Sequence, residues 1–203
     1  MALGLPLTSC GRTYRQKGYR FVPTPQTGDV APDFALSTDS GEIFRLSGHR
    51  GNVVVLFFYP QDDTQGCTIE NLEFSALREE FAAAGATVVG ISPDSVESHC
   101  RFRDRHKLGV VLAADPERVA IEAYGLWGPK VTFGHEHIGL HRTTFIIGPD
   151  GRVAGVHPVP RIKGHAAKML EAVRLLATSQ GRVTEKTVRG GARRGSAARS
   201  ESR

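Results

Sequence analysis

Cysteine is sparse in this sequence, and long apolar runs are missing from it. The 203 residues include three cysteines, Cys10, Cys67 and Cys100, an odd and low number that excludes the dense disulfide framework of a small secreted domain. The longest apolar run, Val53 to Tyr59, is far shorter than the roughly 20 residues that span a bilayer. We therefore expect no membrane partner, and a reducing cytoplasm is the expected location.

The N-terminal segment also lacks the signature of a secretory signal. Its short apolar stretch has no basic residue before it and is interrupted by Pro6, whereas a signal peptide begins with a basic flank. Residues 1–26 contain four basic and no acidic side chains, which leaves an organelle transit peptide as an alternative. We predict a basic N-terminal extension over residues 1–26.

The C-terminal segment accounts for the net charge of the chain. Residues 181–203 hold seven Lys or Arg and two Glu, which equals the net charge of +5 of the whole sequence. A basic tail can attract nucleic acid, but a solvated extension is the simpler interpretation of such a composition. We predict a disordered basic tail over 181–203, no nucleic-acid partner, and one domain over 27–180.

The domain alternates between strand and helix patterns. The apolar run 52–59 is typical of a strand covered on both faces of a sheet, and Gly-Pro-Asp-Gly at 148–151 predicts a hairpin turn. The other expected strands are 34–36, 43–46, 87–91, 110–113, 143–147 and 153–157; the expected helices are 68–84, from a cap at Asp94 or Ser95 to about 105, 115–124 and 165–177. This order predicts an α/β fold with a mixed central β-sheet flanked by helices, and it matches the thioredoxin topology.

Cys67 lies where the buried strand passes through a loop and enters a helix. The free N–H groups and the dipole of the first helical turn stabilise a thiolate, so we expect a reactive sulfur at neutral pH. The alternative is a small buried hydrophobe, which is uncommon at a strand-to-helix loop between Gly66 and Thr68. The Cys-x-x-Cys pair of thioredoxins is absent because Thr64 takes the first position, and the Thr64 hydroxyl can donate to sulfur or to an incoming oxygen.

The string Pro60-x-x-x-Thr64-x-x-Cys67 resembles the active-site motif of peroxiredoxins, the AhpC/TSA family. The form Thr-x-Gly-Cys-Thr-x-Glu is similar to the branch of the bacterioferritin comigratory protein, or PrxQ. Further strings follow in the order of that family: Gly28-Asp29-x-Ala31-Pro32-Asp33-Phe34, Gly90-Ile91-Ser92-x-Asp94, Tyr124-Gly125-x-Trp127-Gly128 and His141-Arg142-Thr143-Thr144-Phe145. The resemblance covers about residues 27–178 and implies a thioredoxin-like thiol-dependent peroxidase that reduces hydrogen peroxide and organic hydroperoxides.

The resemblance also implies a role for each residue of the motif. Cys67 would be the peroxidatic nucleophile, which becomes a sulfenic acid. Thr64 and the N–H groups of Gly66 and Cys67 would hold the peroxide, Arg142 would stabilise the thiolate and the polarised O–O bond, and Pro60 would shield the sulfur from water. Without the resemblance, Arg142 would be interpreted as an edge residue of its strand. No metal or organic cofactor is expected.

Glu70 allows two interpretations. It matches an acidic position of the family and could orient Arg142, or it could be a solvated glutamate in the first turn, where the helix dipole favours it. We leave Glu70 outside the predicted catalytic set.

The sequence departs from the family pattern at the resolving cysteine, which reacts with the sulfenic acid in the second half of the reaction. Many members carry a resolving cysteine five residues after the nucleophile, but this position is Leu72. Cys100, on the helix after the next strand, is the candidate resolving cysteine, about one turn earlier than the usual register. A disulfide with Cys67 would require the first helix turn to unwind. The alternative is a buried Cys100 beside Val96, with the sulfenic acid reduced directly by an outside thiol; Cys10 is interpreted as incidental.

The expected partners are a hydroperoxide substrate and thioredoxin or another thiol reductant, acting on a monomer or weak dimer. A peroxide sensor, or a binding module that acts through the basic tails, is the alternative function. His135, His137 and His141 could be interpreted as a metal cluster, but the segment 134–139 has the composition of a polar loop, and no separated second half of a site accompanies it. We predict no metal site.

Overall fold

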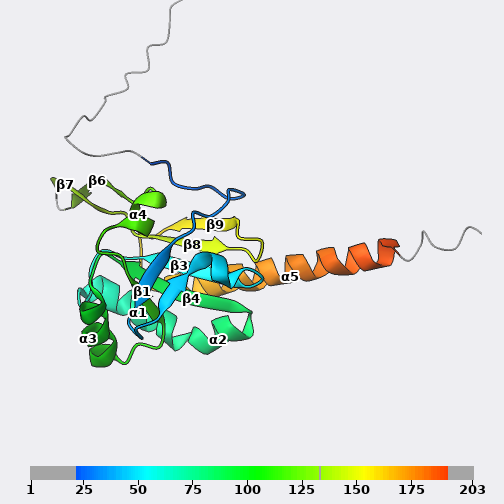
Figure 1. The fold of residues 1–203 in the computed structure, drawn as a ribbon, viewed down its shortest axis with the longest axis horizontal. Helices are drawn as coiled ribbons and strands as arrows, with labels where there is room; N and C mark the ends of the chain where they lie inside the picture. Colours follow the sequence, from blue (N-terminus) through cyan, green and yellow to red (C-terminus); the bar gives the residue numbers. More distant parts are fainter. Residues whose placement is uncertain (1–21, 133, 192–203) are drawn as a thin grey trace, which may run out of the picture.

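The computed structural model describes residues 22–132 and 134–191. Cys10 and most of the predicted N-terminal extension lie outside the described residues. Seven strands form one mixed sheet in the order β2-β1-β5-β4-β3-β8-β9, as Figure 1 shows. Their bounds are β1 (Ala35–Thr38), β2 (Ile43–Arg45), β3 (Val53–Phe58), β4 (Ala86–Ser92), β5 (Val111–Ala114), β8 (Thr143–Ile147) and β9 (Val153–Pro158). Strands β3, β4 and β5 are parallel to one another, and the other pairs are antiparallel.

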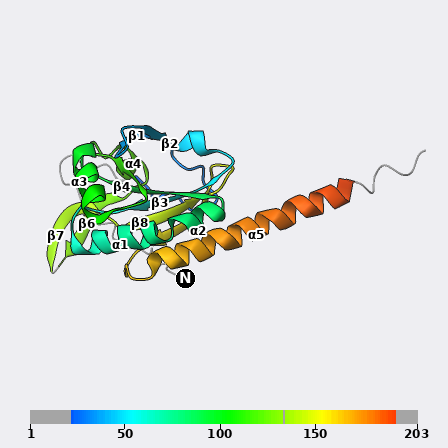
Figure 2. The same cartoon turned by 90° about the horizontal axis from the view of Figure 1, so that it is seen from below.

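The helices cover both faces of this sheet, as the sequence predicted. Figure 2 shows α1, α2 and α5 on one side of the sheet and α4 on the other. The helices are η1 (Leu46–His49), α1 (Gln65–Ala76), α2 (Arg78–Ala83), α3 (Val96–His106), α4 (Val119–Ala123) and α5 (His165–Gly191). Within the part of the chain that the structure describes, none of them combines the length and the apolar character that a bilayer crossing requires.

Strand β3 is the centre of the fold because both of its faces are buried. Val54, Leu56 and Phe58 point into the core cluster that contains α4, and the alternate residues Val55 and Phe57 point into the cluster beneath α1, α2, α3 and α5. All six residues of β3 are buried. Side chains alternate between the faces of a strand, so a continuous apolar run is required here.

The register of β3 brings two distant segments of the chain together. Phe58, the last residue of β3, pairs with Thr143, the first residue of β8. The chain that leaves β3 leads to Cys67 after nine residues, and the residue that precedes β8 is Arg142. The two therefore emerge at the same edge of the sheet.

Three elements differ from the predictions. The helix expected over 68–84 begins at Gln65 and is divided at Leu77, whose backbone (φ −98°, ψ 6°) separates α1 from α2. Leu77 packs against the core cluster beneath these helices. Periodicity detected the apolar face but not the break between the helices, since both helices contribute buried side chains to the same core cluster.

The interpretation of the segment 134–139 as a polar loop is wrong, because most of it forms a strand. Strand β6 (Trp127–Thr132) pairs with β7 (His135–Leu140) in a separate two-stranded antiparallel sheet. The first four residues of β7 are exposed, so they show none of the apolar alternation by which a half-buried strand is recognised.

Helix α5 continues to Gly191, beyond the end expected at Ala177 and into the segment assigned to a disordered tail. Gly181 is the only glycine or proline between the expected end and Gly190, and one glycine costs a helix only about 1 kcal/mol. In Figures 1 and 2 the second half of α5 projects away from the sheet.

Candidate active site

Cys67 is the third residue of α1, in the first turn of the helix, as predicted. The first helical hydrogen bond runs from Thr68 N to the Thr64 carbonyl at 2.9 Å, so the N–H groups of residues 65–67 have no partner within the helix. These groups and the helix dipole favour a negative charge. Cys67 is 1% exposed and packs in the core cluster with Tyr59 and Phe74. A thiolate there is kept from bulk water.

Arg142 is the cationic partner of this sulfur. Its Nη2 lies 3.1 Å from Cys67 Sγ and donates a hydrogen bond to it, while its Nη1 pairs with a carboxylate oxygen of Glu70. Burial lowers the pKa of Arg142, but the neighbouring Glu70 and Cys67 reverse this, so that the pKa is raised above its ordinary value. The guanidinium therefore remains charged beside the sulfur. The prediction that Arg142 reaches the helix start agrees with this geometry.

Glu70 is a member of the site, and its interpretation as a solvated glutamate is wrong. Its side chain is 1% exposed, against 15% for Arg142, because it lies one turn after Cys67 on the inner face of α1. Burial raises the pKa of the Glu70 carboxyl to about 7, although Arg142 acts in the opposite direction. Within the described residues the second oxygen, Oε1, is buried without a hydrogen-bond partner. Half of this carboxylate is thus unsatisfied, which disfavours its charged form.

Thr64 and Pro60 lie on the loop that leads to the helix. Thr64 is the N-cap residue of α1 and is exposed. Its hydroxyl donates to the Gln61 carbonyl at 3.2 Å, and its own carbonyl accepts from the Thr68 hydroxyl at 2.9 Å. Pro60 is half-buried and directly follows the fully buried Tyr59. Thr64 directly precedes α1, and Pro60 lies five residues before its first residue.

Gly66 lies in close contact with another segment, which covers the first turn of α1. A Cβ built on Gly66 would lie 2.8 Å from Cδ1 of Ile162 and 3.9 Å from Nη2 of Arg142. Glu73, on the same helix, accepts from the Gly164 N–H at 2.9 and 3.0 Å. The loop before α5 is therefore held against α1 and covers the residue before Cys67. Nothing in the composition of this loop pointed to that role.

Cys100 is placed apart from Cys67. Both thiols are free, and Cys100 is half-buried on α3, where its Sγ donates to the Asp39 carbonyl at 3.3 Å. Asp39 follows β1 and Arg142 precedes β8, and β1 and β8 are four strand positions apart in the sheet, or roughly 19 Å at about 4.8 Å per step. A disulfide needs Cα atoms about 4.4 to 6.8 Å apart. In this conformation the two cysteines are not poised to bond.

A broad hollow lies beside Arg142, between the β6–β7 hairpin and the segments at the start of β8 and the end of β9. Its volume is about 880 Å³, and both cationic and apolar side chains line it. The lining includes Leu126, Lys130, His141, Arg142, Val156 and Val159. Arg142 thus contacts the buried sulfur and also borders an open space at the surface.

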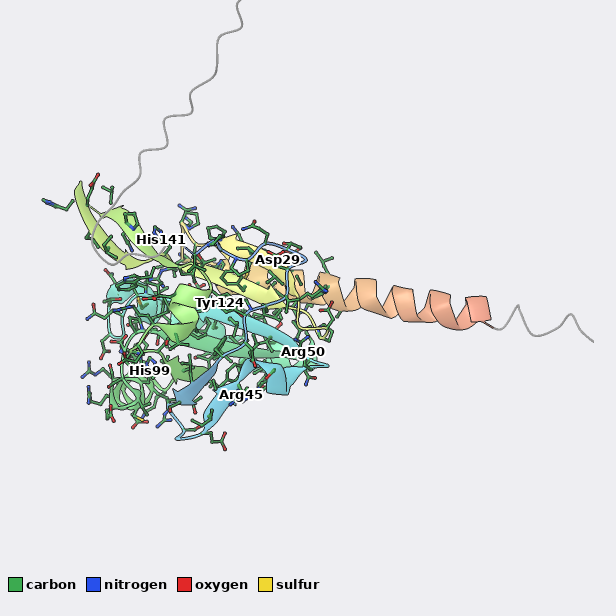
Figure 3. The ribbon with its side chains drawn as sticks, turned by 45° about the horizontal axis from the view of Figure 1, so that its top comes forward. Asp29, Arg45, Arg50, His99, Tyr124 and His141 are labelled. Carbon is green, nitrogen blue, oxygen red and sulfur yellow. The ribbon has the colours of Figure 1, made fainter. Side chains whose placement is uncertain are left out.

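The histidines near the β6–β7 hairpin do not form a cluster with other ligands. In residues 22–132 and 134–191 no group of three or more His, Cys, Asp or Glu side chains could hold a metal ion. Figure 3 shows His141 beside the hairpin and His99 on α3, in different parts of the domain. The Nδ1 of His137 faces the carbonyl of His135 at 3.3 Å.

Comparison with known proteins decides the family. The model of the AhpC/TSA family matches residues 27–156. The chain is 39% identical over 151 residues to peroxiredoxin Bcp of Bacillus subtilis, an alignment that covers 74% of this chain and 96% of that protein. The chain belongs to the AhpC/TSA family. It is a peroxiredoxin, a thiol-dependent peroxidase that acts on peroxides with a thiol reductant, and the sensor and binding-module alternatives are not favoured.

Solved structures place this peroxiredoxin in the PrxQ branch and confirm the thioredoxin-like fold. The bacterioferritin comigratory protein of Xanthomonas campestris, studied for alkyl peroxide reduction, is 35% identical with a TM-score of 0.67, over 71% of this chain and 92% of that one. BcpB of Mycobacterium tuberculosis is 34% identical with a TM-score of 0.66, over 74% of this chain and 97% of that one. The branch predicted from the cysteine motif is therefore confirmed.

Proposed function

We propose that Cys67 of this peroxiredoxin attacks the terminal oxygen of a hydroperoxide, with Arg142, Thr64, Pro60 and the start of α1 in supporting roles. The contact between Arg142 Nη2 and Cys67 Sγ, 3.1 Å at a buried helix start, carries this proposal. A cation beside the sulfur stabilises the attacking thiolate. It also lies where the reacting O–O bond becomes polarised, and charge stabilisation of this kind is among the largest contributions to catalysis.

The reaction balances with the protein thiol as the electron donor. The thiol first gives its proton to solvent, and the thiolate then forms an S–O bond as the O–O bond breaks. The leaving alkoxide or hydroxide takes up a proton and departs as an alcohol or water, while Cys67 becomes a sulfenic acid. Two further thiol equivalents return the sulfenic acid to the thiol and release water and a disulfide.

Thr64 has a defined part in this scheme. Its hydroxyl proton is directed to the Gln61 carbonyl, which leaves the oxygen lone pairs to accept a hydrogen bond from the hydroperoxide O–H. The free N–H groups of residues 65–67 point out of the helix start and would hold the other peroxide oxygen. Pro60, next to the buried Tyr59, would limit the access of water.

The hollow beside Arg142 supports organic hydroperoxides as substrates in addition to hydrogen peroxide. Leu126, Val156 and Val159 supply an apolar lining, and apolar groups gain about 25 cal/mol per Å² on burial. We further propose thioredoxin as the reductant, a monomer or weak dimer as the working state, and the cytoplasm as the location. We also propose the division of the chain into an N-terminal extension over 1–26, a domain over 27–180 and a tail over 181–203. The first part of this tail, up to Gly191, continues helix α5.

The test is a peroxide-consumption assay run with a thioredoxin system and with a glutathione system. Cys67→Ser is expected to abolish consumption while circular dichroism shows an intact fold; consumption that persists would refute the assignment. Cys100→Ser is expected to spare the first turnover. After one equivalent of peroxide, mass spectrometry identifies a Cys67–Cys100 disulfide if Cys100 resolves. Oxidised protein without an intramolecular link would instead exclude Cys100 and favour direct reduction by an outside thiol.

A further inference from the structure

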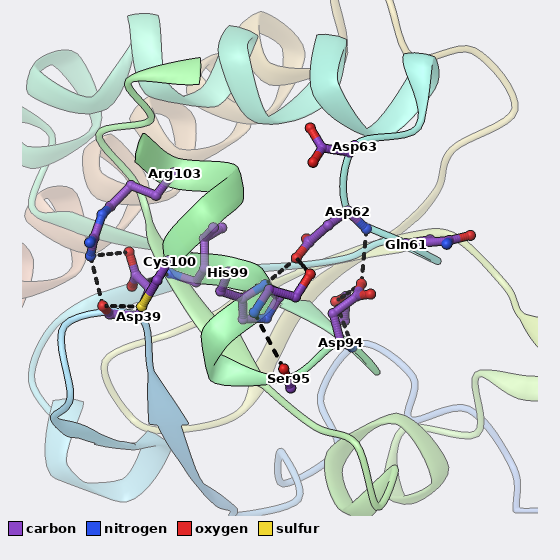
Figure 4. A network of polar contacts seen from close by, with 12 residues as sticks. Asp39, Gln61, Asp62, Asp63, Asp94, Ser95, His99, Cys100 and Arg103 are labelled. Carbon is purple, nitrogen blue, oxygen red and sulfur yellow. Dashed lines mark hydrogen bonds and ion pairs between the residues drawn. The ribbon is translucent and has the colours of Figure 1, made fainter. Parts of the chain in front are cut away.

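Asp62, in the loop between β3 and α1, is a buried carboxylate with three side-chain partners. It is 6% exposed. Its Oδ1 accepts from the Tyr59 hydroxyl at 2.8 Å, and its Oδ2 accepts from the Ser98 hydroxyl at 2.8 Å and contacts Nδ1 of His99 at 2.9 Å. Figure 4 shows Asp62 and His99 facing each other between the loop and α3. A carboxylate this deeply buried is stable only when hydrogen bonds satisfy it.

The ionisation of Asp62 follows from these contacts. Burial raises the pKa of Asp62, but the hydrogen bonds and charge of His99, with Tyr59 and Ser98, reverse this and hold the pKa below its ordinary value. The carboxylate is therefore ionised and accepts, so Nδ1 of His99 must carry the proton. His99 is fully buried, and its Nε2 has no hydrogen-bond partner in the described residues. Its polar contact with Asp62 is directed at the loop.

The same loop is held to α3 at a second, exposed point. Asp63 has a left-handed backbone (φ 56°), a conformation that costs most residues roughly 1–2 kcal/mol. Its carboxylate pairs with Arg105 at 2.8 Å and with Nε2 of His106 at 2.8 Å. The chain thus offers two Asp–His pairs between the same two elements. One is buried, and the other is solvent-exposed and worth at most about 1 kcal/mol.

Asp62 lies two residues before Thr64 and five before Cys67. Its backbone N–H also donates to Asp94 Oδ2 at 2.9 Å, and the same oxygen accepts from the Ser92 hydroxyl at 2.7 Å. The loop is therefore held by its main chain and its side chain immediately before the residues that meet the peroxide. A displacement of about 1 Å at such a point can cost about a hundredfold in rate.

We propose that the buried Asp62–His99 pair is a positioning device for peroxide reduction, which holds the loop so that Thr64 and the first turn of α1 face the substrate. Neither residue contacts the sulfur; both act through the loop. This inference rests on the proposed function of Cys67 and adds to it the contribution of α3, an element outside the cysteine motif.

The experiment measures two rate constants for Cys67 in a Cys10→Ser, Cys100→Ser background, so that only this thiol reacts. Stopped-flow oxidation by hydrogen peroxide depends on thiolate reactivity and on peroxide positioning. Alkylation by iodoacetamide depends on thiolate reactivity but not on peroxide positioning. Asp62→Asn and His99→Leu are expected to slow oxidation about 10- to 100-fold and to change alkylation less than threefold. His99→Asn, whose amide can donate from near the position of Nδ1, is expected to recover most of the oxidation rate.

The exposed pair supplies the matched control. Asp63→Asn and His106→Asn are expected to leave the oxidation rate within about threefold of the parent. If the Asp62 and His99 variants lose stability but their folded forms are oxidised at the rate of the parent, the pair has a merely structural role and the proposal is overturned. Equal losses of oxidation rate at the buried and the exposed pair would also overturn it. If His99→Leu does not fold, the comparison of Asp62→Asn with Asp63→Asn decides. Failure of the parent itself to be oxidised would refute the proposed function instead, which keeps the two results distinct.

Discussion

We predict that Glu70 makes the stability of this peroxiredoxin fall with rising pH in a defined window. Burial raises the pKa of its carboxyl from the ordinary 4.5 to about 7 in the folded chain. Between these values the folded protein binds a proton that the unfolded chain has lost. The stabilising contribution is complete below about pH 4.5 and is lost as the pH rises through 7. The difference of about 2.5 pH units corresponds to about 3 kcal/mol, at about 1.4 kcal/mol per unit.

The substitution Glu70→Gln isolates this contribution. A glutamine can still accept from Arg142, and its shape is nearly unchanged. Its NH₂ group would stand where Oε1 has no partner in the described residues, which adds a cost of about 1–3 kcal/mol that does not depend on pH. The measurement is urea unfolding of the wild type and the variant at several pH values from 4 to 8.

We expect the stability of the variant relative to the wild type to rise by about 3 kcal/mol across this range. Other titrating groups, among them the buried His165 with a pKa of about 4, are present in both proteins and cancel in the difference. Glu79→Gln, at a side chain that is 91% exposed, controls for the loss of one carboxylate. A difference that stays constant within about 0.5 kcal/mol would refute the assignment of a raised pKa to Glu70.

The remaining predictions concern activity and backbone geometry. Arg142→Lys is expected to lower the rate of Cys67 oxidation about a hundredfold, since the single nitrogen of an ammonium lacks the rigid planar fork with which two guanidinium nitrogens contact Cys67 and Glu70; stopped-flow oxidation checks this, and a rate near that of the wild type contradicts it. Val159→Trp, which partly fills the hollow beside Arg142, is expected to raise KM for cumene hydroperoxide about tenfold with little change for hydrogen peroxide; an equal change for both substrates would remove the hollow from the substrate path. Gly125→Ala is expected to cost about 2–4 kcal/mol in thermal or urea unfolding, because Gly125 has φ +66° and its Cβ would lie 2.4 Å from the Val22 carbonyl oxygen. Gly41→Ala, at φ +83° with nothing within 4 Å, is expected to cost only about 1 kcal/mol, and similar losses at the two glycines would show that the close contact contributes nothing.

Much of the fold was predictable because the sequence carries it in local signals. The apolar run of β3 required burial on both faces, the Ser95 cap before α3 is made, with Ser98 N donating to its hydroxyl at 3.3 Å, and the Gly-Pro-Asp-Gly turn joins β8 to β9. The β6–β7 hairpin was missed because its exposed face carries no alternation of apolar and polar residues. The end of α5 was missed because the basic segment after Gln180 was interpreted as a solvated tail with nothing to bury.

The sequence by itself was enough to propose the nucleophile of this protein. Cys67 stands at a strand-to-helix junction after Thr64, and this depends on residues close together in the chain, as does the charge-stabilising first turn of α1. Tertiary structure alone decided which partners reach it. The pairing of Phe58 with Thr143 brings Arg142 to the sulfur, burial converts Glu70 from an ordinary surface acid into a titrating partner, and packing of α3 on the loop joins Asp62 to His99. These contacts join residues 37 to 75 positions apart, and no local pattern specifies which distant side chain will share a buried space.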